Sequence, residues 1–434
     1  MEIIQLPGYT IEEKMNIAKR HLVPKAIERH ALESRMVTFS DETLRLVVNG
    51  YTREAGVRSL ERQLSALCRR VAVMVAKQLP PLSSNSPLDS FRKLRDNNYQ
   101  SYDPKVWEGF IEMGWTALTI PENYGGLDFG YTGLGQILEE TGKTLTKSPL
   151  ISSILLSATA IRLSDNEILK SKSLPDLMNG KTLMSLALDE KSYFDPYSIE
   201  TTALLSGDNF IINGEKKMVI DACDSDFLIV VTTLNESISL FLVDSKSKGI
   251  DIKTDVLMDA GSYSSISFNN VSVPAKNQLD IEVEGETILK SILDIGAIGL
   301  SCEMLGSVQA AFNQTMDYIK ERQQFGTKIG SYQGLQHRAA DLFCEIELCK
   351  SIIIKALQSI DDQNESLSKY AHLAKAKLGE VLKLTSNEAI QMHGGIGVTD
   401  DVNIGFYLKR ARVIQRLLGD TNYHLGCIAK QKGY

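Results

Sequence analysis

The sequence predicts an α+β protein in which a central β domain lies between two helical domains, preceded by a small all-α segment. Apolar residues recur at intervals of three and four from residue 281 onward, which is typical of packed helices. Short β-rich runs separated by turn residues occupy 181–280, which is typical of a compact β domain. Prolines and small polar residues at 81–87 indicate a linker between a first helical segment at 1–80 and a second at 88–180.

Composition is that of an ordinary globular protein of more than one domain. The chain has 434 residues, 43% of them hydrophobic and 23% charged, and this length exceeds what one hydrophobic core usually serves. The net charge of -7 gives no reason to expect nucleic acid as a partner. Residues 1–80 hold 13 Lys and Arg against 9 Asp and Glu, a balance of +4 that leaves -11 for the remainder. This asymmetry indicates two segments of different origin.

Cellular location is read from the cysteines and the amino terminus. The six cysteines form no C-x-x-C pair, so we expect reduced thiols and no metal site. The first residues lack a basic region followed by an apolar run, and no stretch has the ~18 apolar residues of a membrane span. Cytoplasm is therefore the default expectation.

The first segment has helix signals and a run of residues that is similar to a known protein family. Thr10 and Glu13 have capping-box spacing, and apolar residues at Leu60, Leu64, Leu67 and Val71 follow a helical period. The run YTREAGVRSLER at 51–62 resembles the helical lid of the ATPase module of Lon-type proteases. In that family the arginine matching Arg58 contacts nucleotide phosphates. The chain has no G-x-x-x-x-G-K-[ST] loop, so we interpret Arg58 as a solvated helix arginine and the segment as a lid fragment.

The region 88–180 contains helical runs joined by a turn. Gly114-Trp115, Pro121-Glu122 and Gly125-Gly126 occur in that order, and the proline and paired glycines mark the turn. This arrangement resembles the amino-terminal helical domain of acyl-CoA dehydrogenases.

The region 181–280 is expected to form strands divided by hairpin turns at 206–208 and at 213–214. In acyl-CoA dehydrogenases the β domain covers one face of the flavin through a T-E-P motif and an aromatic residue after G-x-K. This chain has LDEK at 188–191 and Met218 at those places. A thioether can still pack on a flat ring system, so the resemblance still implies a flavin here.

The last region is expected to be a four-helix bundle. A first long helix presents Leu300, Met304 and Val308 on one face, and further helical patterns cover 335–360, 366–393 and 402–430. Two motifs make the bundle specific, RQQFG at 322–326 and QMHGG at 391–395. Both resemble the flavin-binding signature of acyl-CoA dehydrogenases.

The resemblance implies FAD as cofactor and gives roles to several residues. In the family, the residue matching Arg322 contacts the pyrophosphate, a task that suits a guanidinium, and those matching Phe325 and Gln333 lie near the adenosine half. The backbone at Gly394 and Gly395 is expected to approach the FAD of a neighbouring subunit. The expected cofactor-binding set is therefore Arg322, Gln324, Phe325, Gln333, Gln391, Gly394, Gly395 and Thr421.

The family reaction also needs a carboxylate that removes the α proton of the acyl thioester. Most members place a glutamate before Gly-Thr near the end of the chain, where this sequence has Gly419, followed by Asp420. A second position used by some members aligns with Gly296, two residues from Asp294. Asp420 is the first candidate for the catalytic base and Asp294 the weaker alternative.

Three interpretations of function follow. The first is FAD-dependent α,β-dehydrogenation of an acyl-CoA thioester, with electrons passing to an electron-transfer acceptor protein. The second is a flavin-binding, non-catalytic subunit paired with a related chain, so that the oligomer is homomeric or heteromeric. The third is a proteolysis-related interaction module, or Lon-type protease fragment, built on residues 1–80.

Overall fold

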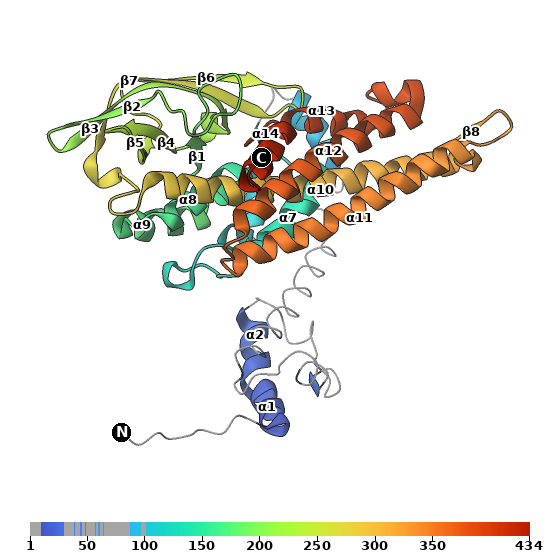
Figure 1. Cartoon of the computed structure of the whole chain (residues 1–434), viewed down its shortest axis with the longest axis horizontal. Helices are drawn as coiled ribbons and strands as arrows, with labels where there is room; N and C mark the ends of the chain where they lie inside the picture. The colour runs from blue at the N-terminus through green and yellow to red at the C-terminus, as the bar shows by residue number, and fades with distance from the viewer. Residues whose placement is uncertain are drawn as a thin grey trace. The chain divides into compact units, whose positions relative to one another are not determined.

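The structure is a computed structural model, shown in Figure 1. It describes residues 10–29, 39, 44, 45, 48, 57, 60, 64, 87–96 and 101–434. The chain divides into two compact units, residues 1–81 and 82–434.

The first unit is helical where it is described. It contains α1 (Ile11–Ile17), η1 (Ala18–Leu22) and α2 (Val23–Arg29). The predicted capping box is confirmed, because Thr10 accepts from the Glu13 backbone and Glu13 in turn accepts from the Thr10 backbone. Leu60 and Leu64 are buried in its core, as their spacing predicts. Arg58, Leu67, Val71 and most of the predicted linker lie outside the described residues.

The second unit starts with short helices that cover the later bundle. They are α5 (Pro87–Asp96), α6 (Pro104–Glu112), η2 (Trp115–Ala117), η3 (Glu122–Tyr124), α7 (Tyr131–Thr144), η4 (Leu150–Ala158), α8 (Thr159–Leu163) and α9 (Glu167–Met178). Asp103 caps α6 and Pro104 is its first residue, a combination that suits a helix start. The turn predicted around Pro121 and Gly125 is present, with Gly125 in the left-handed conformation.

A mixed sheet follows the helices and lies at one end of the second unit (Figure 1). Its strands are β1 (Met184–Ala187), β2 (Thr202–Ser206), β3 (Asn209–Ile220), β4 (Phe227–Leu234), β5 (Ser237–Asp244), β6 (Ile250–Val256) and β7 (Ser262–Pro274). The sheet order is β1-β4-β2-β3-β7-β6, with β5 paired to β4, and only the β1-β4 and β2-β4 pairs are parallel. The apolar faces of these strands form one core.

One predicted hairpin is present and the other prediction was wrong. Strands β2 and β3 are joined by a tight turn at Gly207 and Asp208. Asn213 and Gly214 instead lie inside β3, which pairs with β7 on both sides of them with a register shift between Ile212 and Gly214. A glycine is required at this bulge, because a Cβ on Gly214 would lie 2.4 Å from the Thr201 Oγ1.

Five helices complete the unit. They are α10 (Gly285–Glu321), α11 (Gln333–Asp361), α12 (Leu367–His393), α13 (Ile404–Ile414) and α14 (Thr421–Gln431). The single helix predicted at 402–430 is therefore wrong, since it divides at 415–420. The break has a backbone cause: Leu418 and Gly419 have φ values of 54° and 93°, which a right-handed helix does not allow.

Helix α10 is the central element of the bundle. Its middle part, residues 292–308, is buried on every side, because α7, α12 and the sheet domain all pack around it. At its far end from the sheet, the short hairpin of β8 (Gln323–Gln324) and β9 (Thr327–Lys328) projects from the bundle (Figure 1). Among the described helices, none has the length and apolarity to cross a bilayer.

Candidate active site

The predicted cofactor residues gather mainly at one end of the bundle. Arg322 ends α10 and is exposed. The turn that follows is a two-residue hairpin loop, in which Phe325 and Gly326 have φ values of 53° and 81°. Such loops favour Asn-Gly, yet here the first position carries a phenylalanine that is 92% exposed. Neither the turn geometry nor burial within the chain accounts for this residue, which is consistent with a binding role.

The paired glycines lie at the same end as Arg322. The Tyr318 hydroxyl, one turn before Arg322, donates to the His393 carbonyl at 3.2 Å, and the two rings stack with centroids 4.3 Å apart. Gly394 then leaves α12 with φ 69°. A Cβ on Gly394 or on Gly395 would meet no atom within 4 Å. The space beside these two Cα atoms is therefore open to a ligand, while the Gly394 N–H bonds to the carbonyls of Gln391 and Ile390. We call Arg322, the β8–β9 hairpin and Gly394-Gly395 the cofactor end.

The cofactor end fits a large anionic cofactor. The side chains of Arg322, Gln324, Gln333 and Gln391 are all exposed, and they supply a guanidinium fork and amides without competing carboxylate bonds among the described residues. Thr421 does not belong to this group. It begins α14 and packs on α12, where its Oγ1 lies 2.3 Å from the place a Cβ on Gly379 would take.

The predicted catalytic residues lie around residues 415–420, which we call the reaction turn. A Cβ on Gly419 would lie 2.6 Å from Cδ1 of Tyr423 and 3.2 Å from Cδ1 of Phe194. Together with its φ of 93°, this contact means that a glutamate at 419 could not be accommodated without moving Tyr423. The residue that faces the second family position is Leu418, whose Cδ1 lies 2.6 Å from a Cβ built on Gly296.

The two candidate bases differ in burial and in their partners. Asp420 is exposed and caps α14, accepting from the Tyr423 backbone N–H at 2.9 Å. Asp294 is buried on α10, 3.7 Å from the Lys290 ammonium. Burial raises the pKa of Asp294 to about 6, although Lys290 opposes the shift. Such a carboxyl can exchange a proton near neutral pH.

Two buried side chains hold the reaction turn from beneath. The Lys375 ammonium donates to the carbonyls of Gly419 at 2.9 Å and Gln415 at 3.1 Å. His424 Nε2 lies 3.0 Å from the Leu418 carbonyl and must donate to it. The 2.9 Å contact between His424 Nδ1 and His372 Nδ1 needs one donor and one acceptor, so the two rings are not both charged.

Burial disfavours the charged forms of these groups. It lowers the pKa of Lys375 to about 7. Burial, with help from Lys375 and His372, lowers the pKa of His424 to about 3. Apart from the helical positions of Lys375 and His424, nothing in the sequence indicated either role.

In the β domain, the segments that differ from the expected flavin-covering motifs are held by buried contacts. Lys216 is fully buried and pairs with Glu190 at 2.6 Å, while also donating to the Leu188 carbonyl at 3.1 Å. Met218 has φ 55° and lies at a second register shift of β3, which re-aims a side chain relative to its neighbours. The altered segment is thus firmly anchored.

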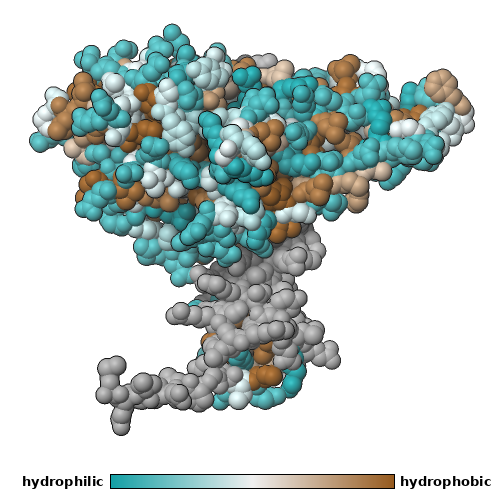
Figure 2. Space-filling model, in the orientation of Figure 1, coloured by the Kyte–Doolittle hydropathy of each residue, from teal (hydrophilic) through white to brown (hydrophobic). Residues whose placement is uncertain are grey.

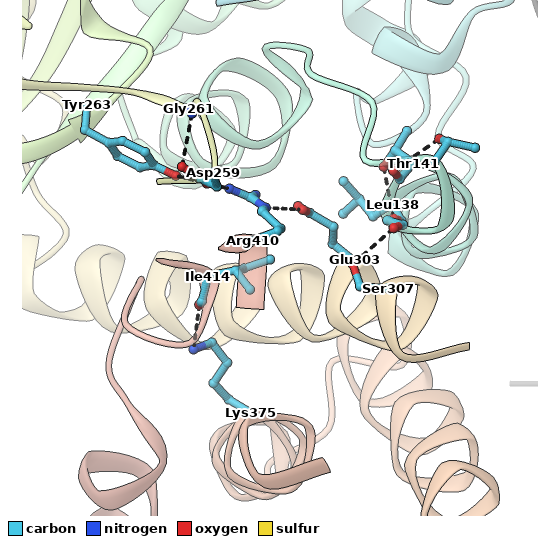
Figure 3. Close-up of polar contacts among 12 residues, drawn as sticks. Leu138, Thr141, Asp259, Gly261, Tyr263, Glu303, Ser307, Lys375, Arg410 and Ile414 are labelled. Carbon is cyan, nitrogen blue, oxygen red and sulfur yellow. Dashed lines mark hydrogen bonds and ion pairs between the residues drawn. The ribbon is translucent and has the colours of Figure 1, made fainter. Parts of the chain in front are cut away.

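A separate polar network joins the β domain to the last helices (Figure 3). The Arg410 guanidinium lies between two carboxylates, with Nε 2.8 Å from Glu303 and Nη1 2.7 Å from Asp259. The Tyr263 hydroxyl donates to Asp259 and accepts from Arg410, each at 3.1 Å. Asp259 and Arg410 are 151 residues apart in sequence, which is why the sequence did not reveal their pairing.

Comparison with known proteins identifies the family. The chain matches the N-terminal domain of acyl-CoA dehydrogenase at 87–181, the middle domain at 187–271 and the C-terminal domain at 284–433. A probable acyl-CoA dehydrogenase from Bacillus subtilis is 31% identical over 74% of this chain and 87% of that protein. This chain belongs to the acyl-CoA dehydrogenase family. Residues 28–81 match the ATPase lid domain of Lon protease.

Other similar proteins agree with this assignment. The short/branched chain specific acyl-CoA dehydrogenase of Rattus norvegicus is 29% identical over 76% of this chain and 78% of its own. The structure of butyryl-CoA dehydrogenase from Megasphaera elsdenii has a TM-score of 0.72 at 23% identity, covering 82% of this chain and all of that one. The ChsE4-ChsE5 complex from Mycobacterium tuberculosis has the same TM-score at 19% identity, covering 81% and 98%.

The family assignment settles the class of chemistry. The chain is an oxidoreductase of the acyl-CoA dehydrogenase family, whose members are flavoproteins, and FAD is its cofactor.

Proposed function

We propose that this chain catalyses α,β-dehydrogenation of an acyl-CoA thioester in an oligomer, where the cofactor end of one chain completes the reaction turn of another. One observation supports the proposal that two chains together form each site. Gly296, which meets the reaction turn, and Arg322 are 26 residues apart along α10. At ~1.5 Å per residue they are separated by about 39 Å along the helix axis. One bound FAD does not bridge that distance, so the two sets of residues serve different cofactor molecules.

The surface of α11 supports association. It exposes Phe343, Leu348 and Ile354 at 52%, 56% and 57%, and hydrophobic patches interrupt the polar surface in the region of α11 and α12 (Figure 2). Large exposed apolar side chains on one helix favour contact with another protein.

Different residues of the chain have different roles in the proposed reaction. Bound FAD supplies the acceptor for the β hydrogen as hydride. Arg322 balances the pyrophosphate charge, and the open backbone at Gly394-Gly395 lets the cofactor approach closely. Lys375 and His424 fix the carbonyls of the reaction turn, and Asp420 is the first candidate to take the α proton, with Asp294 as the alternative. The electrons then pass to an electron-transfer acceptor protein.

The test is anaerobic reduction of the flavin. The full chain is purified, its flavin spectrum is recorded, and acyl-CoA thioesters of varied length are added without oxygen. We expect the flavin absorbance to bleach, the Asp420→Asn chain to lose bleaching, and the Asp294→Asn chain to retain it. Bleaching that survives in Asp420→Asn and is lost in Asp294→Asn would assign the base to α10. A purified chain without flavin would contradict the proposal.

A second function is favoured by the contact between Leu418 and Gly296, where the chain has no carboxylate. In this alternative the chain binds flavin but leaves proton abstraction to a related subunit. The ChsE4-ChsE5 complex shows that two chains of this fold can associate. Co-purification with a second dehydrogenase subunit would support a heteromer. Turnover by a homo-oligomer of this chain alone would contradict it.

A further inference from the structure

A cavity of about 70 Å³ lies beside the reaction turn. Leu150 and Ile151 of η4, Ile220 of β3 and Leu417 of the reaction turn contribute to its wall. Leu417 precedes Leu418, and Ile220 follows Met218 by two residues. The cavity therefore adjoins both the turn that meets Gly296 and the strand that replaces the flavin-covering motif.

The wall of this cavity is charged. It includes two cations, Lys147 and Arg410, and three carboxylates, Asp221, Asp259 and Glu303. With all five ionised, the local balance is 2 - 3 = -1. Burial raises the pKa of Asp221 to about 7, so the balance approaches zero near neutral pH. The charges of Lys147 and Arg410 are then matched by those of Asp259 and Glu303, so a free carboxylate entering the cavity would add an unbalanced negative charge.

Some of these polar atoms have unused hydrogen-bonding capacity. Arg410 donates its hydrogen bonds through Nε and Nη1, so Nη2 has no partner among the described residues. Asp221 accepts from the Ser152 hydroxyl at 2.6 Å through Oδ2, and Oδ1 has no partner in the described part of the chain. The cavity thus offers a donor and an acceptor, and the Lys147 ammonium, which donates to the Ala260 carbonyl, forms a further part of the wall.

Building on the proposed function, we propose that this cavity receives the far end of the acyl group and that this end carries a neutral hydroxyl. A hydroxyl can accept from Arg410 and donate to Asp221. An alkyl end would exclude water from both groups without replacing its hydrogen bonds, which is unfavourable. The site therefore selects a hydroxylated acyl thioester over a plain fatty acyl thioester.

The test compares four CoA thioesters of equal chain length, ending in methyl, hydroxyl, carboxylate or ammonium. Their dissociation constants for the full chain are measured by calorimetry, and the rates of anaerobic flavin reduction are measured in parallel. We expect the hydroxyl form to bind about tenfold more tightly than the methyl form, as one hydrogen bond to a charged group predicts. Equal affinity for the two, or tightest binding of the carboxylate or ammonium form, would overturn the proposal.

Variants separate the cavity from a general effect on folding. Asp221→Asn keeps an acceptor for Ser152, suits the positive φ of 55° at this position, and removes one negative charge. We expect it to improve binding of the carboxylate form about tenfold relative to the methyl form. Lys170→Met, on the surface of α9 and paired with Glu167, is the matched control and should leave all four affinities unchanged. An unchanged ranking in Asp221→Asn would contradict a cavity that receives the acyl end.

The two hypotheses fail in different ways. If no thioester reduces the flavin, the proposed dehydrogenation is wrong, but the binding constants still report whether the cavity selects a hydroxyl. If all four reduce it with equal affinity and rate, dehydrogenation stands and the hydroxyl inference is wrong.

Discussion

The cofactor end and the reaction turn are built in opposite ways. At the cofactor end, Arg322 and Phe325 are exposed, and Gly394-Gly395 have open space where side chains would be. At the reaction turn, the carbonyls of Leu418 and Gly419 are bonded from beneath by buried His424 and Lys375. One region has open space beside its backbone, while the other is held by hydrogen bonds within its own chain.

This difference separates two requirements of catalysis. Groups that orient a reacting substrate must be held in place before it binds, and the reaction turn meets that requirement through internal hydrogen bonds. Groups that only bind a cofactor can be ordered by the cofactor itself. Substitutions in the two regions should therefore affect different quantities.

The largest effect on stability is expected at Lys375. Lys375→Met leaves the Gly419 and Gln415 carbonyls buried without donors, which should lower the free energy of unfolding by about 3 kcal/mol. Urea unfolding measures this change. Lys377→Met removes an ion pair with Glu345 that is only partly buried, and it should cost less than about 1 kcal/mol. Equal losses in both variants would show that the reaction turn is not held by Lys375.

The next effect concerns the cofactor and not the fold. Arg322→Ala removes charge-assisted hydrogen bonds of about 1.5–3 kcal/mol, so FAD affinity should fall roughly 10- to 150-fold. Equilibrium dialysis of FAD measures it, and the unfolding free energy should not change. Lys320→Ala, two residues earlier and also exposed on α10, is the matched control. If the Arg322→Ala chain binds FAD with unchanged affinity, Arg322 does not contact the pyrophosphate.

The acid sensitivity of the reaction turn comes from His424. Its pKa is about 3 in the folded chain and ~6.5 when unfolded, so the unfolded state binds more protons between these values. Stability should then fall as the pH drops below 6.5, by about 2 kcal/mol at pH 5. His424→Gln retains a donor but does not titrate, and its unfolding free energy should vary less between pH 7 and pH 5. If the free energy of unfolding of this variant depends on pH as it does in the unaltered chain, His424 is not the cause. His337→Gln, at an exposed position of α11, serves as the control.

The smallest effect is expected at the hairpin tip. Phe325→Asn places a residue that tolerates positive φ in a two-residue loop and should stabilise the isolated chain by about 0.5–1 kcal/mol. The same change should weaken FAD binding or subunit association, measured by dialysis and by sedimentation. Gain of stability without loss of either would mean that Phe325 has no binding role.

The sequence predicted the fold class and the burial of Leu60 and Leu64, because these depend on local spacing and periodicity, while the roles of the cofactor motifs stay predictions that rest on the family resemblance. It did not predict the division of 402–430 into two helices, which follows from positive φ values at Leu418 and Gly419. Nor could it show that Leu418 meets Gly296, since the two residues are 122 positions apart and the chain between them forms α11, α12 and α13. Asn213-Gly214 was misread because the same dipeptide suits a hairpin or a bulge.

The length of α10 has a consequence for genetics. In the proposed arrangement, Arg322 and the reaction turn of one chain serve different FAD molecules, so a chain with Arg322→Ala and a chain with Asp420→Asn each retain what the other lacks. When both alleles are expressed in the same cell, mixed oligomers should contain some sites built from an intact Arg322 and an intact Asp420. Two inactive alleles of a single gene would then complement each other, whereas two alleles altered at the same end would not.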